Sequence, residues 1–319
     1  MRMRGMQCVI LAAGRGTRLG RLSRTRSKAM LPVLGKPMVE RVMEPILAHG
    51  VSDFTLVVSP DDAEIAHHFR YRSNVRLVHQ TERQGMAHAL FCAAPLIRGD
   101  FVLSACDSIV SAEHVGRLMA AWQAEPSPHA VLALMTAEPE RLGDIAIVET
   151  DGPRVTRIVE KPSPAEAPSD ITSLPLYCFS PRILDYLPKV PLSPRGEYEL
   201  QDAIQLLIER DGHIRGVMLD QRLTLTNPND LLTINQHYLA HSNDPLLVAA
   251  DQVGPNAQFV PPLRIEARTV IGADCTIGPG VYVEQDCRLG DGATIRNAII
   301  LRASTVPDGA TIEEKVISH

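Results

Sequence analysis

The sequence predicts an α/β protein: a mostly parallel sheet flanked by helices, followed by a small parallel β-helix. Over the first two-thirds of the chain, short apolar runs alternate with amphipathic stretches, the order typical of parallel strands joined by helices. From about Val253, apolar residues instead recur at every sixth position, a period that fits neither a helix nor an ordinary strand. We therefore expect two domains, spanning 1–243 and 244–319.

Seven apolar runs are the strands expected in the first domain: Met6–Ala12, Asp53–Ser59, Val75–His79, Phe101–Ala105, Ala130–Met135, Arg154–Val159 and Leu174–Phe179. The clearest helix lies between the first two runs, with Pro37 at its start, one apolar stripe, and Gly50 at its end. Four more helices are expected, at Gly85–Leu96, Ala112–Gln123, Tyr198–Glu209 and Asn229–His241.

The C-terminal period is the hexapeptide-repeat pattern of a parallel β-helix. Its apolar positions are Val253, Phe259, Ile265, Ile271, Ile277, Val283, Leu289 and Ile295, and after a slip of one residue Val306 and Ile312. Cys275 and Cys287 share one hexad position, where a small residue packs inside the coil, so we expect both to be structural. We expect this domain to serve assembly and stability and to have no chemistry of its own.

Composition excludes several classes of protein. The net charge of -5 gives no reason to expect nucleic acid or an anionic membrane as a partner. No apolar run approaches the ~20 residues of a membrane helix. The six cysteines are scattered, without zinc-site spacing, which favours a cytoplasmic location. Arg2 and Arg4 precede an apolar run, but that run is too short for a signal peptide and ends in a charged glycine loop.

The most informative stretch follows the first strand, where the sequence reads AAGRGTRLG and then SKAMLPVLGKP. A strand that opens into a glycine-rich turn presents backbone N–H groups to an anion. Arg15, Arg18 and Lys28 add positive charge beside that turn. The spacing is neither that of a P-loop nor that of the dinucleotide fingerprint. The pattern nevertheless predicts binding of a nucleoside triphosphate.

Together, these two segments resemble the signature of the sugar-1-phosphate nucleotidyltransferases, which make nucleotide-sugars. The resemblance implies a Rossmann-like catalytic domain and a left-handed β-helix with three short sides per coil, which gives about three coils here. It also implies that the start of the loop contacts the nucleotide, through Leu11, Ala12, Ala13, Gly14, Arg15, Gly16 and Thr17.

The segment QTERQGMAHAL resembles the Q-x4-G-T-A-H-A-L element of the same family, with Met86 in place of the usual Thr. The Gln80 side chain offers a donor and an acceptor that match O4 and N3–H of uracil or thymine. Gly85 lets the backbone approach the base. We therefore expect UTP or dTTP, with a slight preference for UTP. His88 either contacts ribose or phosphate or faces outward.

Two further motifs concern the metal and the sugar. Asp107 follows an apolar strand, where a carboxylate can hold Mg²⁺ against a triphosphate. The family has Gly-Asp at this point, and this chain has Cys106-Asp107. RIVEKP resembles the family's V-E-K-P motif, which implies that Glu160 accepts hydrogen bonds from sugar hydroxyls and that Lys161 holds the 1-phosphate.

The chain also departs from the family. Where the family has a second metal carboxylate, the sequence reads TLTNPNDLL, with Thr224 at that position and Asn227 near the turn. The second ligand is therefore open between Asp220, Thr224 and Asn227. The sugar pocket differs too, because GDIAIVE lacks the usual Tyr-Gly and Pro175 stands where Gly is usual. The sugar is left unassigned.

The reaction implied is attack by a sugar-1-phosphate oxygen on the α-phosphorus of an NTP. Arg18 would hold the outgoing β and γ phosphates, Lys28 the α-phosphate, and Asp107 the Mg²⁺. We expect a homo-oligomer. Three alternatives are kept: an acetyl-transferring β-helix, which has no His before His319 to act as base; a regulatory subunit that binds a nucleotide-sugar; and a purine-using enzyme that makes GDP-mannose or ADP-glucose.

Overall fold

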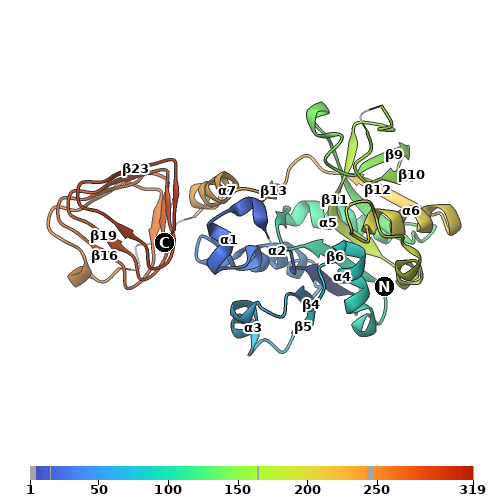
Figure 1. Ribbon diagram of the computed structural model, residues 1–319, viewed down its shortest axis with the longest axis horizontal. Helices are drawn as coiled ribbons and strands as arrows, with labels where there is room; N and C mark the ends of the chain where they lie inside the picture. The colour runs from blue at the N-terminus through green and yellow to red at the C-terminus, as the bar shows by residue number, and fades with distance from the viewer. Residues whose placement is uncertain (1–4, 15, 164, 243–247, 319) are drawn as a thin grey trace. The chain divides into compact units, whose positions relative to one another are not determined.

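The computed structural model describes residues 5–14, 16–163, 165–242 and 248–318 (Figure 1). Contacts divide the chain into two compact units, Met1–Gly14 with Val42–Arg222 and Arg15–Arg41 with Leu223–His319. The predicted domain boundary at 243/244 lies outside the described residues. No helix among the described residues is long and apolar enough to cross a membrane.

A nine-stranded sheet forms the centre of the first unit, in the order β5-β4-β1-β6-β11-β8-β12-β10-β9. The strands are β1 Gln7–Leu11, β4 Asp53–Val58, β5 Val75–His79, β6 Phe101–Ala105, β8 Ala130–Thr136, β9 Ile147–Asp151, β10 Arg154–Val159, β11 Ile171–Phe179 and β12 Ile214–Met218. β11 runs antiparallel to β6 and β8, and β10 to β12 and β9. The remaining strands run in one direction, so the predicted mostly parallel α/β fold is confirmed.

Two strands of this sheet, β9 and β12, were not expected from the sequence. β12 carries Gly216 at its centre, and glycine weakens a strand pattern. In the structure, a Cβ at Gly216 would lie 2.3 Å from Cδ1 of Leu134 on β8. The glycine therefore permits close packing inside the sheet, although it hides the strand in the sequence.

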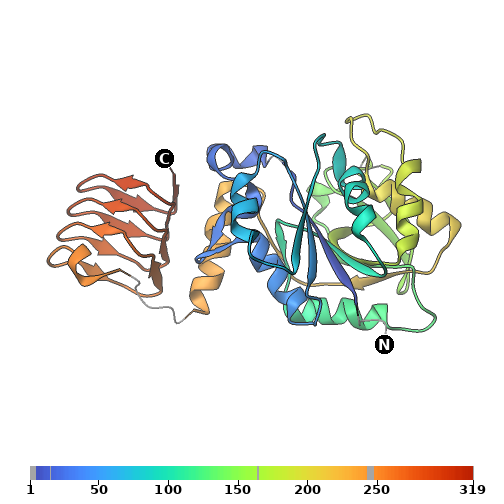
Figure 2. The same cartoon turned by 90° about the horizontal axis from the view of Figure 1, so that it is seen from below.

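Helices cover both faces of this sheet (Figure 2). α4 (Gly85–Ala93) and α6 (Leu200–Arg210) share one apolar core with strand residues such as Val9 and Leu103. α5 (Ala112–Trp122) lies on the opposite face and contacts β8, β11 and β12. A short helix, α3 (Ala63–Phe69), follows β4; Asp62 caps its first turn by accepting a hydrogen bond from the N–H of Ile65.

One helix begins later than the sequence suggested. Pro37 belongs to a short strand, β3 (Lys36–Pro37), paired with β2 (Pro32–Val33), and α2 spans Met38–Leu47. The prediction that Pro37 begins this helix was wrong by one residue, because the backbone at Pro37 pairs with Pro32 instead.

In the second unit, the C-terminal strands stack into three parallel sheets, consistent with the predicted left-handed β-helix (Figures 1 and 2). The strands are β14 Gln258–Phe259, β15 Leu263–Ile265, β16 Val270–Ile271, β17 Thr276–Ile277, β18 Val281–Val283, β19 Arg288–Leu289, β20 Thr294–Arg296, β21 Ile299–Ile300, β22 Thr305–Val306, β23 Thr311–Glu313 and β24 Val316–Ile317. Ile277 stacks on Ile295, and Val283 on Ile300, so the slip of one residue lies between Ile295 and Ile300.

The interior of the β-helix is apolar. The predicted hexad residues Ile265, Ile277 and Ile295 are fully buried. Cys275 and Cys287 also lie in this core. Burial raises the pKa of the Cys287 thiol to about 11, which keeps it protonated and unreactive at neutral pH.

The rest of the second unit consists of short N-terminal elements and one long helix. The short elements are η1 Thr17–Leu19, α1 Leu22–Thr25 and η2 Lys28–Met30, followed by β2 and β3. The long helix, α7 (Pro228–Ala240), begins at a capping box in which Asn227 and Asp230 satisfy each other's backbone N–H groups. The fully buried Asn235 on α7 accepts a hydrogen bond from the N–H of Leu34 (2.8 Å) and donates to the carbonyl of Pro32 (3.1 Å). These bonds fix the segment that follows Lys28.

Candidate active site

The start of the predicted nucleotide loop is rigid. Leu11 ends β1, and the N–H of Ala12 donates to the carbonyl of Val57 (2.7 Å). Ala12 and Ala13 are buried, whereas Gly14 is exposed. A Cβ atom added to Gly14 would have no heavy atom within 4 Å. The chain therefore leaves the sheet at a fixed point and reaches solvent at Gly14.

The loop continues in the second unit; Arg15 lies outside the described residues. Gly16 has a φ of 61°, in the left-handed region that favours glycine, and precedes η1. Thr17 and Arg18 are exposed on η1, while Leu19 is fully buried beneath them. Lys28 begins η2 and is half-buried, with Ala29 buried behind it. Buried apolar residues thus hold both cations in place.

One residue at this loop was missed by sequence reasoning. The Arg83 guanidinium donates to the carbonyl of Ala13 (2.9 Å) and to the hydroxyl of Ser59 (2.7 Å) at the end of β4. It therefore joins the QTERQG segment to the first turn of the nucleotide loop. In the sequence, Arg83 is recognisable only as a basic residue directly before Gln84 and Gly85. Its contact with Ala13 is seen only in the folded structure.

Gln80 and the residues after it form a compact group. Gln80 is 4% exposed, and its amide nitrogen lies 3.1 Å from both the carbonyl of Gly85 and Nδ1 of His88. Gly85 has a φ of 94°, and a Cβ there would lie 2.6 Å from the carbonyl oxygen of Tyr198. The glycine is thus required by a close approach within the protein. Met86 packs against the core.

Asp107 lies half-buried in the turn after β6, and its charge acts on a residue that the sequence did not single out. This residue is Arg222, which follows β12. Burial and the neighbouring Arg141 lower the pKa of Arg222, while Asp107 and Tyr177 raise it. Burial also raises the pKa of Tyr177 to about 12. Asp107, the predicted metal carboxylate, therefore interacts electrostatically with a partly desolvated cation.

The charge of Glu160 also acts on Tyr177. Burial and the neighbouring Glu199 raise the pKa of Glu160, and Arg195 and Lys161 lower it. Arg195 bridges the two carboxylates, with Nη2 3.1 Å from Glu160 and 2.7 Å from Glu199.

Lys161 has a φ of 46°, which is unusual for a residue other than glycine and marks a backbone held by its surroundings. Its N–H donates to the carbonyl of Ile145 (3.2 Å). Lys161 and Arg195 thus act on Glu160. The charge of Glu160 acts on Tyr177, which in turn interacts with Arg222. Arginine is common on protein surfaces, so nothing in the sequence selected Arg195 or Arg222.

The three candidates for a second metal ligand have different surroundings. The Asp220 carboxylate forms a short 2.5 Å contact with His114, which lowers the pKa of Asp220. Asn227 uses its side-chain oxygen to cap α7. Thr224 ends β13 (Leu223–Thr224) and brings no charge. Two of the three thus already have structural partners.

Among the described residues, no cluster of three or more His, Cys, Asp or Glu side chains is placed to hold a metal. Mg²⁺ is often bound by one or two carboxylates together with substrate phosphates and water. Asp107 provides one such carboxylate, so the donor set is compatible with Mg²⁺ bound together with a triphosphate.

Comparison with known proteins identifies the family. The model of the family described as nucleotidyl transferase matches residues 7–241. The chain belongs to the nucleotidyl transferase family. A second model, described as the GMPPB C-terminal domain, matches residues 259–319, the β-helix. The predicted family resemblance is therefore confirmed.

Individual relatives of this chain differ in the nucleotide that their names specify and in their length. The UTP–glucose-1-phosphate uridylyltransferase AglF of Haloferax volcanii is 33% identical over 231 residues, covering 70% of this chain and 93% of the relative. A glucose-1-phosphate thymidylyltransferase of Streptomyces griseus is 28% identical over 333 residues, covering 98% and 92%. The bifunctional protein GlmU of Methanococcus maripaludis is 29% identical over 235 residues, covering 73% of this chain. The chain spans about half, 54%, of that relative's length.

A solved structure shows the same fold for the larger part of the chain. UDP-glucose pyrophosphorylase complexed with UDP-glucose is 18% identical, has a TM-score of 0.64, and covers 74% of this chain and 99% of that one.

Proposed function

We propose that this chain joins a sugar-1-phosphate to the α-phosphate of a nucleoside triphosphate, with release of pyrophosphate. Membership of the nucleotidyl transferase family carries the proposal. The series of electrostatic interactions that joins Asp107 to Glu160 and Lys161 by way of Arg222 and Tyr177 supports it, because such carboxylates and cations suit a phosphorylated sugar.

In this reaction the protein positions and neutralises two anions. The attacking phosphate oxygen is already ionised, so no general base is needed. Lys161 holds the 1-phosphate of the sugar, and Glu160 accepts hydrogen bonds from its hydroxyls. Arg18 holds the departing phosphates, and Lys28 the α-phosphate as charge builds on it. Mg²⁺ held by Asp107 would supply further positive charge to the phosphates.

UTP or dTTP is the triphosphate that we propose. Gln80 lies buried just after β5, and its amide nitrogen contacts Gly85 and His88. When it exchanges these contacts for the base, the amide can pair with N3–H and O4 of a pyrimidine. The relatives support this choice, since one is a uridylyltransferase and another a thymidylyltransferase. Leu11, Ala12, Ala13, Gly14, Arg15, Gly16 and Thr17 complete the proposed nucleotide site with Gly85 and Met86.

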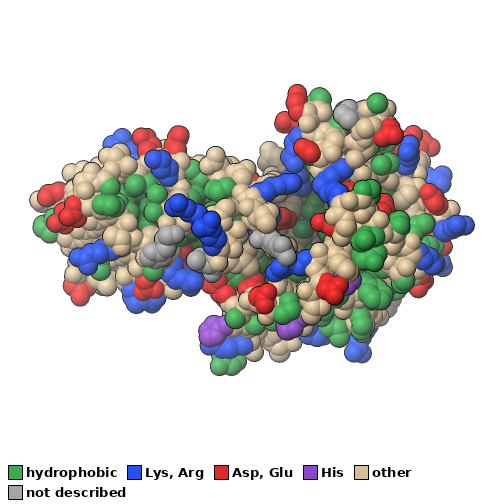
Figure 3. All heavy atoms as spheres, viewed as in Figure 1, with side chains coloured by type: hydrophobic (Ala, Val, Ile, Leu, Met, Phe, Trp, Pro, Cys, Tyr) green, Lys and Arg blue, Asp and Glu red, His purple; other side chains and the backbone are tan. Residues whose placement is uncertain are grey.

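The proposed setting is the cytoplasm, where the protein forms a homo-oligomer. Figure 3 shows acidic and basic side chains of both signs interspersed over the visible face of each unit, without a large basic patch.

One assay tests the reaction. Purified protein is mixed with Mg²⁺ and each pair drawn from UTP, dTTP, GTP and ATP and from several sugar-1-phosphates, and pyrophosphate release is measured. We expect turnover with a pyrimidine triphosphate. Preference for GTP or ATP would refute the base assignment.

A second candidate function is that of a regulatory subunit that binds a nucleotide-sugar without turning it over. The observation that favours it is the state of the second metal position, where Thr224 is uncharged and Asp220 is bonded to His114. This candidate predicts no pyrophosphate release with any pair, together with saturable binding of a nucleotide-sugar by calorimetry.

A further inference from the structure

One side of the β-helix is covered, whereas outward residues of its other sides are exposed. On β16 the outward Val270 is 40% exposed, and on β19 the outward Arg288 is exposed. On the side built from β15, β18, β21 and β24, the outward Tyr282 is fully buried and Ile299 is 1% exposed. A tyrosine that points out of the coil yet lies buried must be covered by another part of the same unit.

The cover is formed by residues 26–41 and α7. Gly35 approaches β15 so closely that a Cβ would lie 2.6 Å from both Nη2 of Arg264 and Oε1 of Glu266. α7 contacts β24. Asn235 of α7 also fixes Leu34 by a hydrogen bond. The segment after the nucleotide loop therefore lies against the β-helix.

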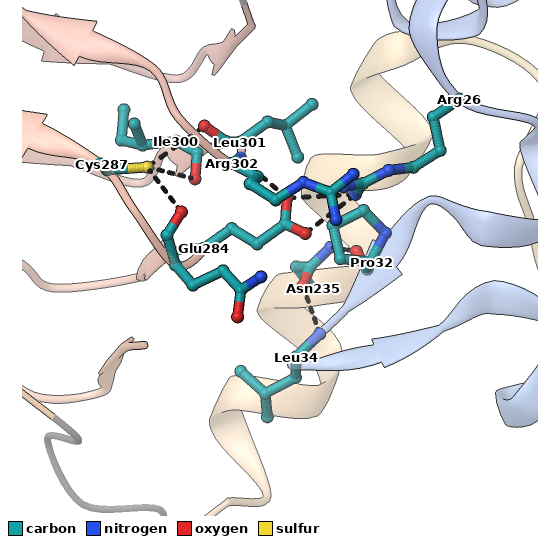
Figure 4. Close-up of polar contacts among 10 residues, drawn as sticks. Arg26, Pro32, Leu34, Asn235, Glu284, Cys287, Ile300, Leu301 and Arg302 are labelled. Carbon is teal, nitrogen blue, oxygen red and sulfur yellow. Dashed lines mark hydrogen bonds and ion pairs between the residues drawn. The ribbon is translucent and has the colours of Figure 1, made fainter. Parts of the chain in front are cut away.

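At the start of this segment is an ion pair that joins residues 258 positions apart (Figure 4). Nη1 of Arg26 lies 2.9 Å and 3.1 Å from the two carboxylate oxygens of Glu284. The side chains are only 9% and 12% exposed. The backbone N–H of Arg302, on the next coil, donates to the same carboxylate (2.8 Å). The stacked coils thus hold Glu284 in place, and Glu284 holds Arg26.

We propose that Glu284 is a positioning residue for nucleotidyl transfer: by holding Arg26, the β-helix fixes the place of Lys28. Only Ser27 separates Arg26 from Lys28, and Ala29 and Met30 are buried on the other side. Lys28 is therefore held between two anchored points. This inference rests on the proposed function, and it gives the β-helix a role in the reaction that extends beyond assembly and stability.

The test compares Glu284→Gln with a matched control, Asp286→Asn. Asp286 pairs with Arg268 on an exposed turn of the same β-helix and does not touch residues 26–41 in any described contact. Removing one partner of a buried pair leaves a desolvated charge, so Arg26 turns toward solvent in Glu284→Gln. We expect kcat to fall at least tenfold with KM for the sugar-1-phosphate within twofold, and amide hydrogen exchange over residues 16–30 to become faster. Asp286→Asn should leave both measurements at the wild-type level.

Rescue separates positioning from general destabilisation. The charge-exchanged protein Arg26→Glu/Glu284→Arg restores the pair, and we expect it to recover at least a third of wild-type kcat and the slow exchange. If Glu284→Gln does not fold, Arg26→Gln removes the same pair from the other side. Wild-type kcat and exchange in whichever variant folds would overturn the inference. If wild type itself releases no pyrophosphate, the proposed function fails, and hydrogen exchange alone still decides whether Glu284 fixes this segment.

Discussion

The two β structures of this protein use polar residues in opposite ways. Beside the nine-stranded sheet, Glu160 after β10 and Asp202 on α6 have pKa values raised by burial, and the like charge of Glu199 adds to the rise. In the β-helix, the polar residues of the covered side are paired, as in Arg264 with Glu266 (2.7 Å) and Arg26 with Glu284. Ionisation of the two carboxylates beside the sheet thus keeps a net cost, although Arg195 pairs with Glu160. On the covered side of the β-helix, Glu266 and Glu284 are each paired with an arginine.

This difference indicates where chemistry is possible. Carboxylates whose ionised form is costly in the folded state gain from a substrate that hydrogen-bonds or neutralises them, and perturbed pKa values often mark functional sites. Paired charges on a packed face mainly fix geometry. We therefore assign substrate contact to the sheet and positioning to the β-helix.

The largest expected effect tests whether the β-helix behaves as a packed core. Ile295 is fully buried between stacked coils, so Ile295→Ala should lower the free energy of unfolding by about 2–5 kcal/mol, measured by urea denaturation. The matched control is Val270→Ala at an outward, exposed position, which should change it by no more than about 0.5 kcal/mol. Equal effects of the two substitutions would contradict the core described for the β-helix.

The next largest effect is expected from removing a positive charge of the proposed active site. Lys28→Ala should reduce kcat by about a hundredfold or more, roughly 3 kcal/mol, and should weaken NTP binding much less, because charge on the α-phosphate grows in the transition state. Lys36→Ala, an exposed lysine on β3, is the control and should keep wild-type kcat. Steady-state kinetics measure both. A rise in KM alone would show that Lys28 contributes only to ground-state binding.

A smaller effect concerns the base. Gln80→Glu removes the amide donor to O4 and keeps an acceptor for N3–H, so it should weaken UTP or dTTP by about 1–3 kcal/mol in titration calorimetry. The control is Gln84→Glu, four residues along at the start of α4. If both variants bind the pyrimidine triphosphates as wild type does, Gln80 is a structural residue that holds Gly85 and His88.

The substitution Glu160→Gln should increase the stability of the protein at high pH and weaken its binding of the sugar-1-phosphate. The raised pKa means that folding penalises the ionised carboxylate, so stability contributed by Glu160 is lost as pH rises through that pKa. The Gln variant lacks this loss, and its stability relative to wild type should increase from pH 5 to pH 8. Its KM for the sugar-1-phosphate should rise about tenfold, or ~1.4 kcal/mol.

Thermal unfolding across that pH range and steady-state kinetics test this expectation. The exposed Glu149→Gln on β9 is the control and should match wild type in both. If Glu160→Gln is instead less stable than wild type at high pH, the ion pair with Arg195 stabilises the ionised Glu160 by more than burial destabilises it.

The smallest effect is expected at the exposed pair of the β-helix. Asp286→Asn removes the partner of Arg268 at a solvent-exposed turn, where ion pairs contribute little and salt screens them. Its melting temperature should stay within experimental scatter of wild type at 0.15 M salt. A clear loss would show that the turns of the β-helix, as well as its interior, hold the coils together.

The local patterns of the sequence were sufficient for most of the fold. The six-residue period predicted the β-helix because each apolar side chain turns inward at the same place on successive coils, as Ile277 and Ile295 do. Strands such as Val75–His79 were predicted to the residue. β12 was missed because Gly216 reads as a strand breaker, and its reason, the contact with Leu134, lies on another strand.

The residues of the candidate site likewise fall into those that the sequence predicted and those that it did not. Motif order and the family resemblance indicated Lys28, Asp107, Glu160 and the other predicted residues. Asp107 and Glu160 come just after strands, whereas Lys28 begins η2. Arg83, Arg195, Arg222 and Glu284 became visible only in the structure. Each acts through a contact with residues distant in sequence or through burial in a shared cluster, as with Arg26 and Glu284, 258 residues apart. Periodicity and motif spacing record local conformation, whereas the pairing and desolvation of charges depend on which distant segments pack together, and only the tertiary structure decides that.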